Sequence, residues 1–253
     1  RKPTANHGMG RRWPPCAPSW LERLRSHRPS TSSTGTSSAT RVIFDGKYKE
    51  ASIAVRNGNS NILVQSWIES NQPGDKGDLP FAVTPPLAKM QANGQQLLRV
   101  LYAGANNDLP QDRESVFWLN VQEIPEAAQG DAVLQVAVRQ RIKLFFRPAG
   151  LRGVAADAPA ALQWRLEKVN GQPSLSLENP SNFHVSINSI TVGTEDGITA
   201  PLMIGPGESR RFPLKTSQPD AMLKFHSVND YGGNDVFKTR LNGAAAVTAT
   251  AEK

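Results

Sequence analysis

Residues 132–147, AVLQVAVRQRIKLFFR, decide the class of fold. From Leu134 onward the even positions read Leu, Val, Val, Gln, Ile, Leu and Phe, whereas most odd positions are polar or basic. Side chains that alternate in this way lie on opposite faces of a β-strand. The alternation extends well beyond the roughly 5–6 residues of an ordinary strand. The stretch therefore predicts an unusually long strand that is apolar along one face and basic near its middle.

Shorter alternating runs, separated by turn residues, occupy most of the chain after residue 40. Asp45-Gly46 and the NGNSN segment are turn sequences of the kind that join paired strands. No segment keeps a 3.6-residue period long enough for a substantial helix. The predicted strands are RVIFD, ASIAVR, ILVQSWIE, FAVTPP, QLLRVLYA and SVFWLNVQEI, then LQWRLEKV, SLSLENP, HVSINSITVG, APLMI, RRFPLK, AMLKFHSV and DVFKTRLNG. Strands at this spacing without intervening helices predict an all-β, antiparallel sandwich architecture.

A small-residue segment, GLRGVAADAPAA (150–161), divides the strands into two series. Each series has roughly the 100 residues of one sandwich. We therefore predict two β-sandwich domains, at residues 40–150 and 151–247, with the long strand closing the first. Residues 1–39 are predicted to be a leader, and residues 248–253 a tail.

The charge of +7 belongs to the first forty residues. They carry seven basic residues and one acidic residue, whereas the other 213 carry 22 basic and 21 acidic residues. This argues against nucleic acid as the partner of the folded body, although the leader alone could be a basic arm. Its Pro, Ser and Thr content favours a disordered or aberrant leader, and it contains no apolar stretch typical of a secretory signal.

Membrane insertion, disulfides and catalysis find little support in the sequence. No apolar run approaches the roughly 18 residues of a membrane span, and the single cysteine, Cys16, lies in the leader. The histidines at positions 7, 27, 184 and 226 lack metal-ligand spacing, and we expect His184 and His226 to be ordinary strand residues. No nucleophile elbow, phosphate loop or dinucleotide fingerprint occurs, and GPGES (205–209) is typical of a turn. We predict no catalytic residue, no metal and no cofactor.

Two cations are the only residues whose positions suggest a binding site. Arg41 opens the first strand of the body, and Lys143 lies in the last strand of the first domain. The first and last strands of a sandwich are often close, so the two cations could converge on a carboxylate or phosphate. From the residues alone, two solvated surface charges remain the simpler alternative.

A family resemblance suggests a function for these two cations. LPQDRESVFWLNVQEIP (109–125) followed by AVLQVAVRQRIKLFFRP (132–148) closely resembles the signature of periplasmic pilus chaperones, which are immunoglobulin-like proteins of the chaperone–usher pathway. The supporting matches, in family order, are TRVIFDG (40–46), QSWIES (65–70), TPP (84–86), ENPS (178–181) and NDYGG (229–233). The resemblance implies two immunoglobulin-like β-sandwich domains at an angle, with a cleft between them.

The resemblance also implies roles for particular residues. Arg41 and Lys143 match the family cations that anchor the C-terminal carboxylate of a pilin subunit. Ile142 and Leu144 are expected in the domain's own core. Three alternating side chains match the row donated into the groove of the pilin, and three charged residues match an ion-pair set that bridges the domains. The donated row is Leu134, Val136 and Val138, and the ion-pair set is Glu114, Arg147 and Asp230.

The implied function is a non-enzymatic periplasmic chaperone that binds, folds and caps pilin subunits by donating a strand, and passes them to an outer-membrane usher. The resemblance implies no cofactor. The short spacing between Pro125 and the apolar row matches the short-loop subclass. The apolar edge also suggests self-association by edge capping, because identical exposed edges can pair.

The chain departs from the family in one place. Where family members have a short apolar strand before the TR motif, this chain has STSSTGTSSA. A defective chaperone paralogue is therefore one alternative function. The others are a two-domain adhesion or carbohydrate-binding module, and an enzyme built on a sandwich scaffold.

Overall fold

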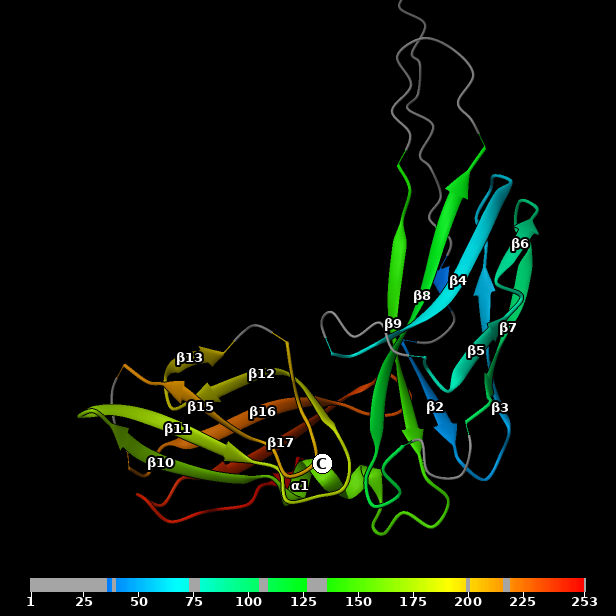
Figure 1. The fold of residues 1–253 in the computed structure, drawn as a ribbon. Helices are drawn as coiled ribbons and strands as arrows, with labels where there is room; N and C mark the ends of the chain where they lie inside the picture. Colours follow the sequence, from blue (N-terminus) through cyan, green and yellow to red (C-terminus); the bar gives the residue numbers. More distant parts are fainter. Residues whose placement is uncertain are drawn as a thin grey trace, which may run out of the picture. The chain divides into compact units, whose positions relative to one another are not determined.

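The computed structural model describes residues 36–37, 40–72, 78–104, 109–126, 136–198, 201–215 and 219–252. Strands dominate these residues, and the segment predicted as a loop between the two series holds a 3-10 turn, η1 (Ala155–Asp157), and a short helix, α1 (Ala158–Ala161). Strands before and after α1 form separate sets (Figure 1). Each set has its own hydrophobic core. The prediction of an all-β protein with two sandwiches is confirmed.

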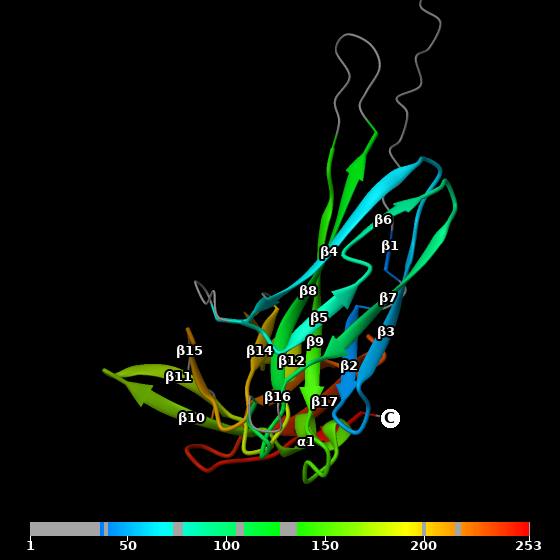
Figure 2. The same ribbon diagram turned by 45° about the vertical axis from the view of Figure 1, so that its right-hand side comes forward.

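Two sheets form the N-terminal sandwich, and Figure 2 shows β3 and β7 to the right of β8 and β9. One sheet has the order β1 (Thr36–Ser37), β3 (Glu50–Arg56), β7 (Gln95–Tyr102), β5 (Phe81–Thr84). The other has the order β2 (Arg41–Asp45), β9 (Arg139–Arg147), β8 (Ser115–Pro125), β4 (Ile62–Ser70), β6 (Leu87–Met90).

The even face of β9 fills the N-terminal core, as its alternation predicts. Ile142, Leu144 and Phe146 are buried there, which confirms the expected core positions of the first two. Phe146 stacks on Tyr102 with their ring centroids 4.9 Å apart. Apolar side chains of this size each stabilise the fold by roughly 1.5–3 kcal/mol when buried.

The pairing of β2 corrects the prediction of a wholly antiparallel sandwich. β2 runs parallel to β9, with Arg41 opposite Lys143 and Asp45 opposite Arg147. Parallel pairing needs a long connection between the two strands. That condition is met, because β3 to β8 lie between them in the sequence. The predicted Asp45-Gly46 turn follows β2, and Gly46 N–H donates to the carbonyl of Arg147 at 2.7 Å.

The long strand is shorter than its alternation predicts. β9 begins at Arg139, and the bond from Glu123 N–H to the Val138 carbonyl, 2.9 Å long, continues the pairing with β8 within the described residues. Hydrogen-bonded pairs alternate along antiparallel strands, so the next such pair would be Pro125 with Val136. Proline has no N–H, so Pro125 cannot donate to Val136. Leu134 lies outside the described residues.

Two expectations about the chain ends are also corrected. The predicted leader lies outside the described residues except for residues 36–37, whose backbone pairs with Val55 and Arg56 of β3. Backbone pairing needs no apolar side chain, so a Ser/Thr-rich sequence can supply it. At the other end, β18 (Thr250–Ala251) pairs with β17, so the predicted tail contributes a strand.

The C-terminal sandwich also has two sheets. One has the order β10 (Gln163–Val169), β11 (Gln172–Glu178), β15 (Ser209–Pro213). The other has the order β13 (Glu195–Ile198), β12 (Val185–Val192), β16 (Met222–Val228), β17 (Asn234–Arg240), β18, with β14 (Leu202–Ile204) also pairing with β12. The core between them includes fully buried Trp164 and Phe225, whose ring centroids are 5.0 Å apart.

Candidate functional site

The start of β2 brings the two predicted cations together. Arg41 and Lys143 are directly opposite each other in the parallel β2–β9 pair. The Arg41 guanidinium donates through Nη1 to the carbonyl of Val228 at 2.9 Å and lies over the ring of Phe145, 5.8 Å from its centroid. Its Nε is buried and has no hydrogen-bond partner among the described residues. The site therefore holds a donor that the protein itself leaves unsatisfied.

Lys143, the second cation, also contacts the C-terminal sandwich. Its ammonium donates to Ser186 Oγ at 3.1 Å. Burial lowers the pKa of Lys143 below its ordinary value, and the neighbouring Arg41 charge lowers it further. Burial likewise lowers the pKa of Arg41, although Asp230 and Glu114 oppose that effect. Both charges are therefore unfavourable where they stand, and an anion placed between them would relieve the penalty.

A cavity of about 310 Å³ lies in front of these cations. Its lining includes Arg41, Lys143 and Arg141, with Ser186 and Trp118 among the neighbours, and no aspartate or glutamate lines it in the described part of the chain. Two or more cations in a carboxylate-free hollow form a receptor for an anion.

The predicted ion-pair set forms one network that joins the two sandwiches. Arg147, the last residue of β9, donates through Nη1 and Nη2 to the two carboxylate oxygens of Asp230 at 2.7 and 2.8 Å. Its Nε donates to Glu114 Oε2 at 2.6 Å. Burial lowers the pKa of Arg147, but hydrogen bonds and charges of Asp230 and Glu114 outweigh burial and raise the pKa above its ordinary value.

Sequence reasoning missed a member of this network, His184. The Glu114 carboxylate is only 1% exposed, and its Oε1 accepts from the backbone N–H of His184 and lies 2.9 Å from His184 Nδ1. Glu114 is thus held by Arg147 from its own sandwich and by His184 from the other. His184 precedes β12 rather than lying within a strand. No local pattern marks it, because its partner lies 70 positions away.

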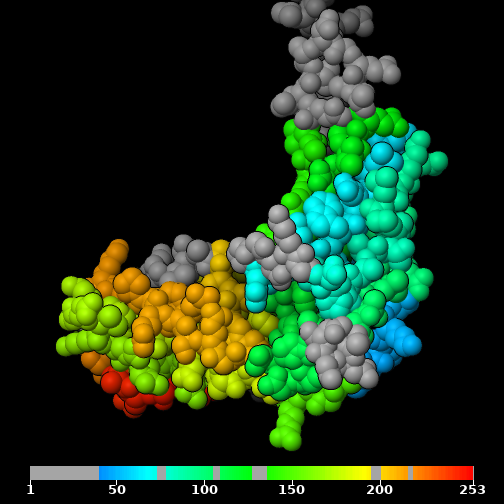
Figure 3. All heavy atoms as spheres, in the orientation of Figure 1, coloured from blue at the N-terminus to red at the C-terminus, as the bar shows by residue number. Residues whose placement is uncertain are grey.

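The described part of the predicted donor row is exposed at one residue and half-buried at the other. Val136 is 52% exposed and Val138 is half-buried, and both precede β9. In the space-filling view, the green residues at this end of the N-terminal sandwich are at the surface (Figure 3). The structure therefore gives the location of two members of the row.

The odd face of β9 carries two arginines stacked on tryptophans. Arg139 lies over Trp67 of β4, 4.8 Å from the ring centroid, and Arg141 lies over Trp118 of β8, at 4.4 Å. Further along this face, Phe145 is buried beneath Arg41 and beside His184, with ring centroids 5.9 Å apart. Sequence alternation alone would have left Phe145 exposed, because its cover comes from the other sandwich.

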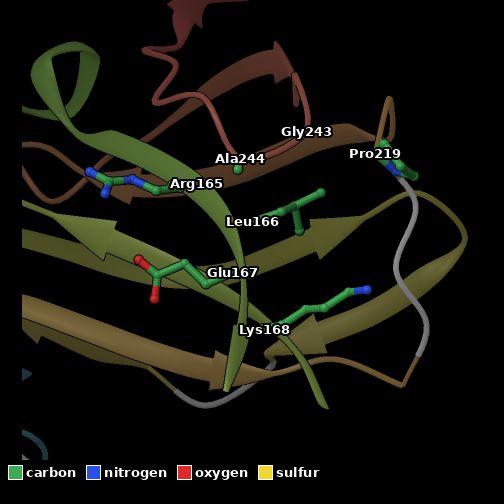
Figure 4. Close-up of a pocket in the computed structure, with 7 residues that line it drawn as sticks. All are labelled: Arg165, Leu166, Glu167, Lys168, Pro219, Gly243 and Ala244. Atoms are coloured by element: carbon green, nitrogen blue, oxygen red, sulfur yellow. The ribbon is translucent and has the colours of Figure 1, made fainter. Parts of the chain in front are cut away.

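A larger hollow, of about 590 Å³, lies along β10 in the C-terminal sandwich. Figure 4 shows Arg165 and Glu167 projecting to one side of β10 and Leu166 and Lys168 to the other, as strand alternation requires. Its carboxylate, Glu167, is already paired with Arg211 at 3.0 Å. Both signs of charge line this hollow, so despite its size it is a weaker anion receptor than the cavity at Arg41 and Lys143.

Within the described residues, no cluster of three or more His, Cys, Asp or Glu side chains is arranged to hold a metal ion. The same residues contain no helix that is long and apolar enough to cross a membrane.

Comparisons with known proteins show which family the chain belongs to. Residues 36–152 match the N-terminal domain of the pili and flagellar-assembly chaperone PapD, and residues 157–238 match the C-terminal domain of the pili assembly chaperone PapD. The chaperone protein LpfB of Salmonella typhimurium is 38% identical over 212 residues, which cover 81% of this chain and 88% of LpfB. The chaperone protein FimB/FhaD of Bordetella pertussis is 35% identical over 83% of this chain and 89% of its own length.

Solved structures give the same result. The YadV chaperone is 36% identical and superimposes with a TM-score of 0.68, covering 82% of this chain and 99% of that structure. A complex of the Salmonella enterica SafA pilin with the SafB chaperone includes a chain that is 29% identical, with a TM-score of 0.71, covering 82% of this chain and 96% of that one. The two matched domains together span most of the chain, and it belongs to the pili assembly chaperone family.

Proposed function

We propose that this protein is a periplasmic chaperone that binds pilin subunits, completes their open fold with the edge of β9, and delivers them to an outer-membrane usher. The C-terminal carboxylate of the subunit is held by Arg41 and Lys143, and the apolar row of Leu134, Val136 and Val138 enters the groove of the subunit. This role involves no catalytic step.

The position at which β2 begins along β9 carries the proposal. β2 pairs with β9 only from Lys143 to Arg147, starting at Arg41. Before Lys143, the described strands pair with β9 on its β8 side only. A strand added by a subunit would continue the line of β2 along the other edge of β9. If it ran parallel to β9, as β2 does, its final carboxylate would arrive beside both cations.

Two sources of affinity then act together. Each aliphatic side chain of the row that becomes buried contributes roughly 1.5–3 kcal/mol. Hydrogen bonds from the two cations to a carboxylate contribute roughly 1.5–3 kcal/mol each. The anchor fixes where the subunit strand ends, and a fixed end sets which apolar side chain enters which part of the groove.

We further propose that Glu114, Arg147 and Asp230, together with His184, hold the two sandwiches in a fixed relation. The anchor depends on that relation, because its cations lie in the N-terminal sandwich while Val228 and Ser186, which bind them, lie in the C-terminal one. Support for the client class comes from relatives, since SafB was solved in complex with the pilin SafA.

The test is co-expression with a cognate pilin, followed by purification of the complex. Arg41→Ala and Lys143→Ala are expected to abolish recovery of the complex while leaving a folded chaperone. Lys238→Ala is the matched control, because Lys238 is an exposed cation that pairs with Glu252 and does not line the anchor cavity. Normal subunit capture by both anchor variants would overturn the assignment.

A further inference from the structure

We propose that Arg141, stacked on Trp118, forms a second anion subsite beside the carboxylate anchor, and that it selects clients with an acidic side chain among their last residues. This inference rests on the proposed function, since it concerns the C-terminal end of the same client. It adds a determinant of client specificity to the anchor.

Trp118 holds the Arg141 guanidinium in place next to the carboxylate anchor. Trp118 is the direct partner of Lys143 in the β8–β9 pairing, and its Nε1 donates to Asn71 Oδ1 at 3.0 Å. Because that bond holds the indole, the guanidinium stacked on it is also restrained. Arg141 lines the same cavity as Arg41 and Lys143, and its side chain is 49% exposed.

Arg141 makes no hydrogen bond to its neighbouring carboxylate, Glu69. Glu69 Oε2 lies 3.7 Å from Arg141 Nη2, too far for a hydrogen bond. The other oxygen, Glu69 Oε1, accepts from Trp67 Nε1 at 2.8 Å and from Arg139 Nη2 at 2.6 Å. A guanidinium has five N–H donors, so Arg141 can donate to a second carboxylate without losing a strong partner.

Arg139, two residues before Arg141 on the same face of the strand, is engaged in hydrogen bonds. Its Nε and Nη2 both donate to Asn120 Oδ1, at 3.0 and 2.7 Å, in addition to the bond to Glu69. It does not line the anchor cavity. Arg139 therefore serves as a matched internal control for Arg141.

Charge and spacing both favour a client with two anionic groups. Three cations and no carboxylate line the cavity where the structure describes its wall, and one C-terminal carboxylate neutralises a single charge. Arg141 and Lys143 lie on the same face of β9, about 6.6 Å apart along the strand. Alternate residues of an extended client have the same spacing. A C-terminal carboxylate and an acidic side chain on the same face can therefore reach both cations at once.

The test measures binding of synthetic peptides by calorimetry. The peptides share an alternating valine–threonine sequence with a free C-terminus, and carry Glu, Gln or Lys in turn at each of the last four positions. We expect Glu to bind about fivefold more tightly than Gln at one position or at two alternate positions, with Lys weaker still. Arg141→Gln should remove this preference, Arg141→Glu should shift it towards Lys, and Arg139→Gln should retain it.

The proposed Arg141 subsite is refuted if no position shows a preference for Glu, or if the preference persists in Arg141→Gln. Preference at two adjacent positions would contradict the same-face geometry. Amidating the C-terminus separates this inference from the proposed function. If amidation reduces the affinity, the carboxylate anchor is supported, whatever the result for Arg141. If amidation leaves the affinity unchanged, the anchor is refuted, but an Arg141-dependent preference for Glu would still support the second subsite. Failure of the wild-type protein to bind any free-carboxylate peptide would refute both.

Discussion

The backbone of Arg41 lies directly opposite that of Lys143 at the point where β2 begins to cover the edge of β9. This relationship places two partly buried cations at the end of a sheet edge that a client strand can extend. Arg41 Nε has no hydrogen-bond partner among the described residues, and burial lowers the pKa of both cations. A client carboxylate bound between them, as we propose, would offset this electrostatic penalty.

The first prediction is that Lys143→Met separates binding from stability. The variant should lose subunit capture, while its midpoint of thermal unfolding stays unchanged or rises, because a desolvated charge beside Arg41 has been removed. Thermal denaturation followed by circular dichroism, together with pull-down of a subunit, measures both properties. A large fall in the unfolding midpoint would mean that Lys143 is structural.

The second prediction concerns the pKa of Lys143, which NMR of its side chain can follow. In the free protein the pKa should lie below the ordinary 10.5, since burial and Arg41 disfavour the charged form, and it should rise when a client carboxylate binds. Between the folded pKa and 10.5 the unfolded chain binds more protons, so stability of the free protein should rise with pH across that interval. A pKa that client binding leaves unchanged would argue against direct contact.

The third prediction is that Glu114→Gln is strongly destabilising. It removes the charge of the buried Glu114 carboxylate, which faces half-buried Arg147, and breaking a pair of this kind costs roughly 3 kcal/mol or more. Urea denaturation gives the free energy of unfolding. Arg99→Gln, which removes an exposed pair with Glu50, is the control and should cost less than about 1 kcal/mol. Equal costs would show that the network does not bear on stability.

The fourth prediction is that polar substitution in the donor row weakens client binding without unfolding the chaperone. Val136→Ser and Val138→Ser should each reduce subunit affinity, by at most roughly 1.5–3 kcal/mol, because the exposed part of each side chain leaves water only in the complex. Val136 is already 52% exposed, so its substitution should leave the unfolding midpoint almost unchanged. Unaltered affinity in the double variant would remove the row from the binding mechanism.

Alternation along the chain predicted much of the fold, because burial of apolar side chains acts residue by residue. It identified the core face of β9, including Ile142 and Leu144, and most of the strands of both sandwiches. It missed β6 (Leu87–Met90) and the parallel pairing of β2. Strand direction depends on the path of the intervening chain, which local pattern does not encode.

Less of the candidate site than of the fold could be predicted from the residues alone. Arg41 and Lys143 were noticed as cations on the first and last strands, but only pairing across the sheet makes them neighbours. The contact of His184 with Glu114 and the burial of Phe145 both depend on the other sandwich. The family signature supplied the role of the anchor, and that role stays a prediction until a complex is examined.

The decisive measurement is a crystal structure of the protein with a pilin subunit. We expect the last strand of the subunit to run parallel to β9 in line with β2, with its carboxylate about 2.7–2.9 Å from both the Arg41 guanidinium and the Lys143 ammonium. A subunit carboxylate bound elsewhere, or a subunit strand antiparallel to β9 with its C-terminus away from Arg41, would contradict this expectation.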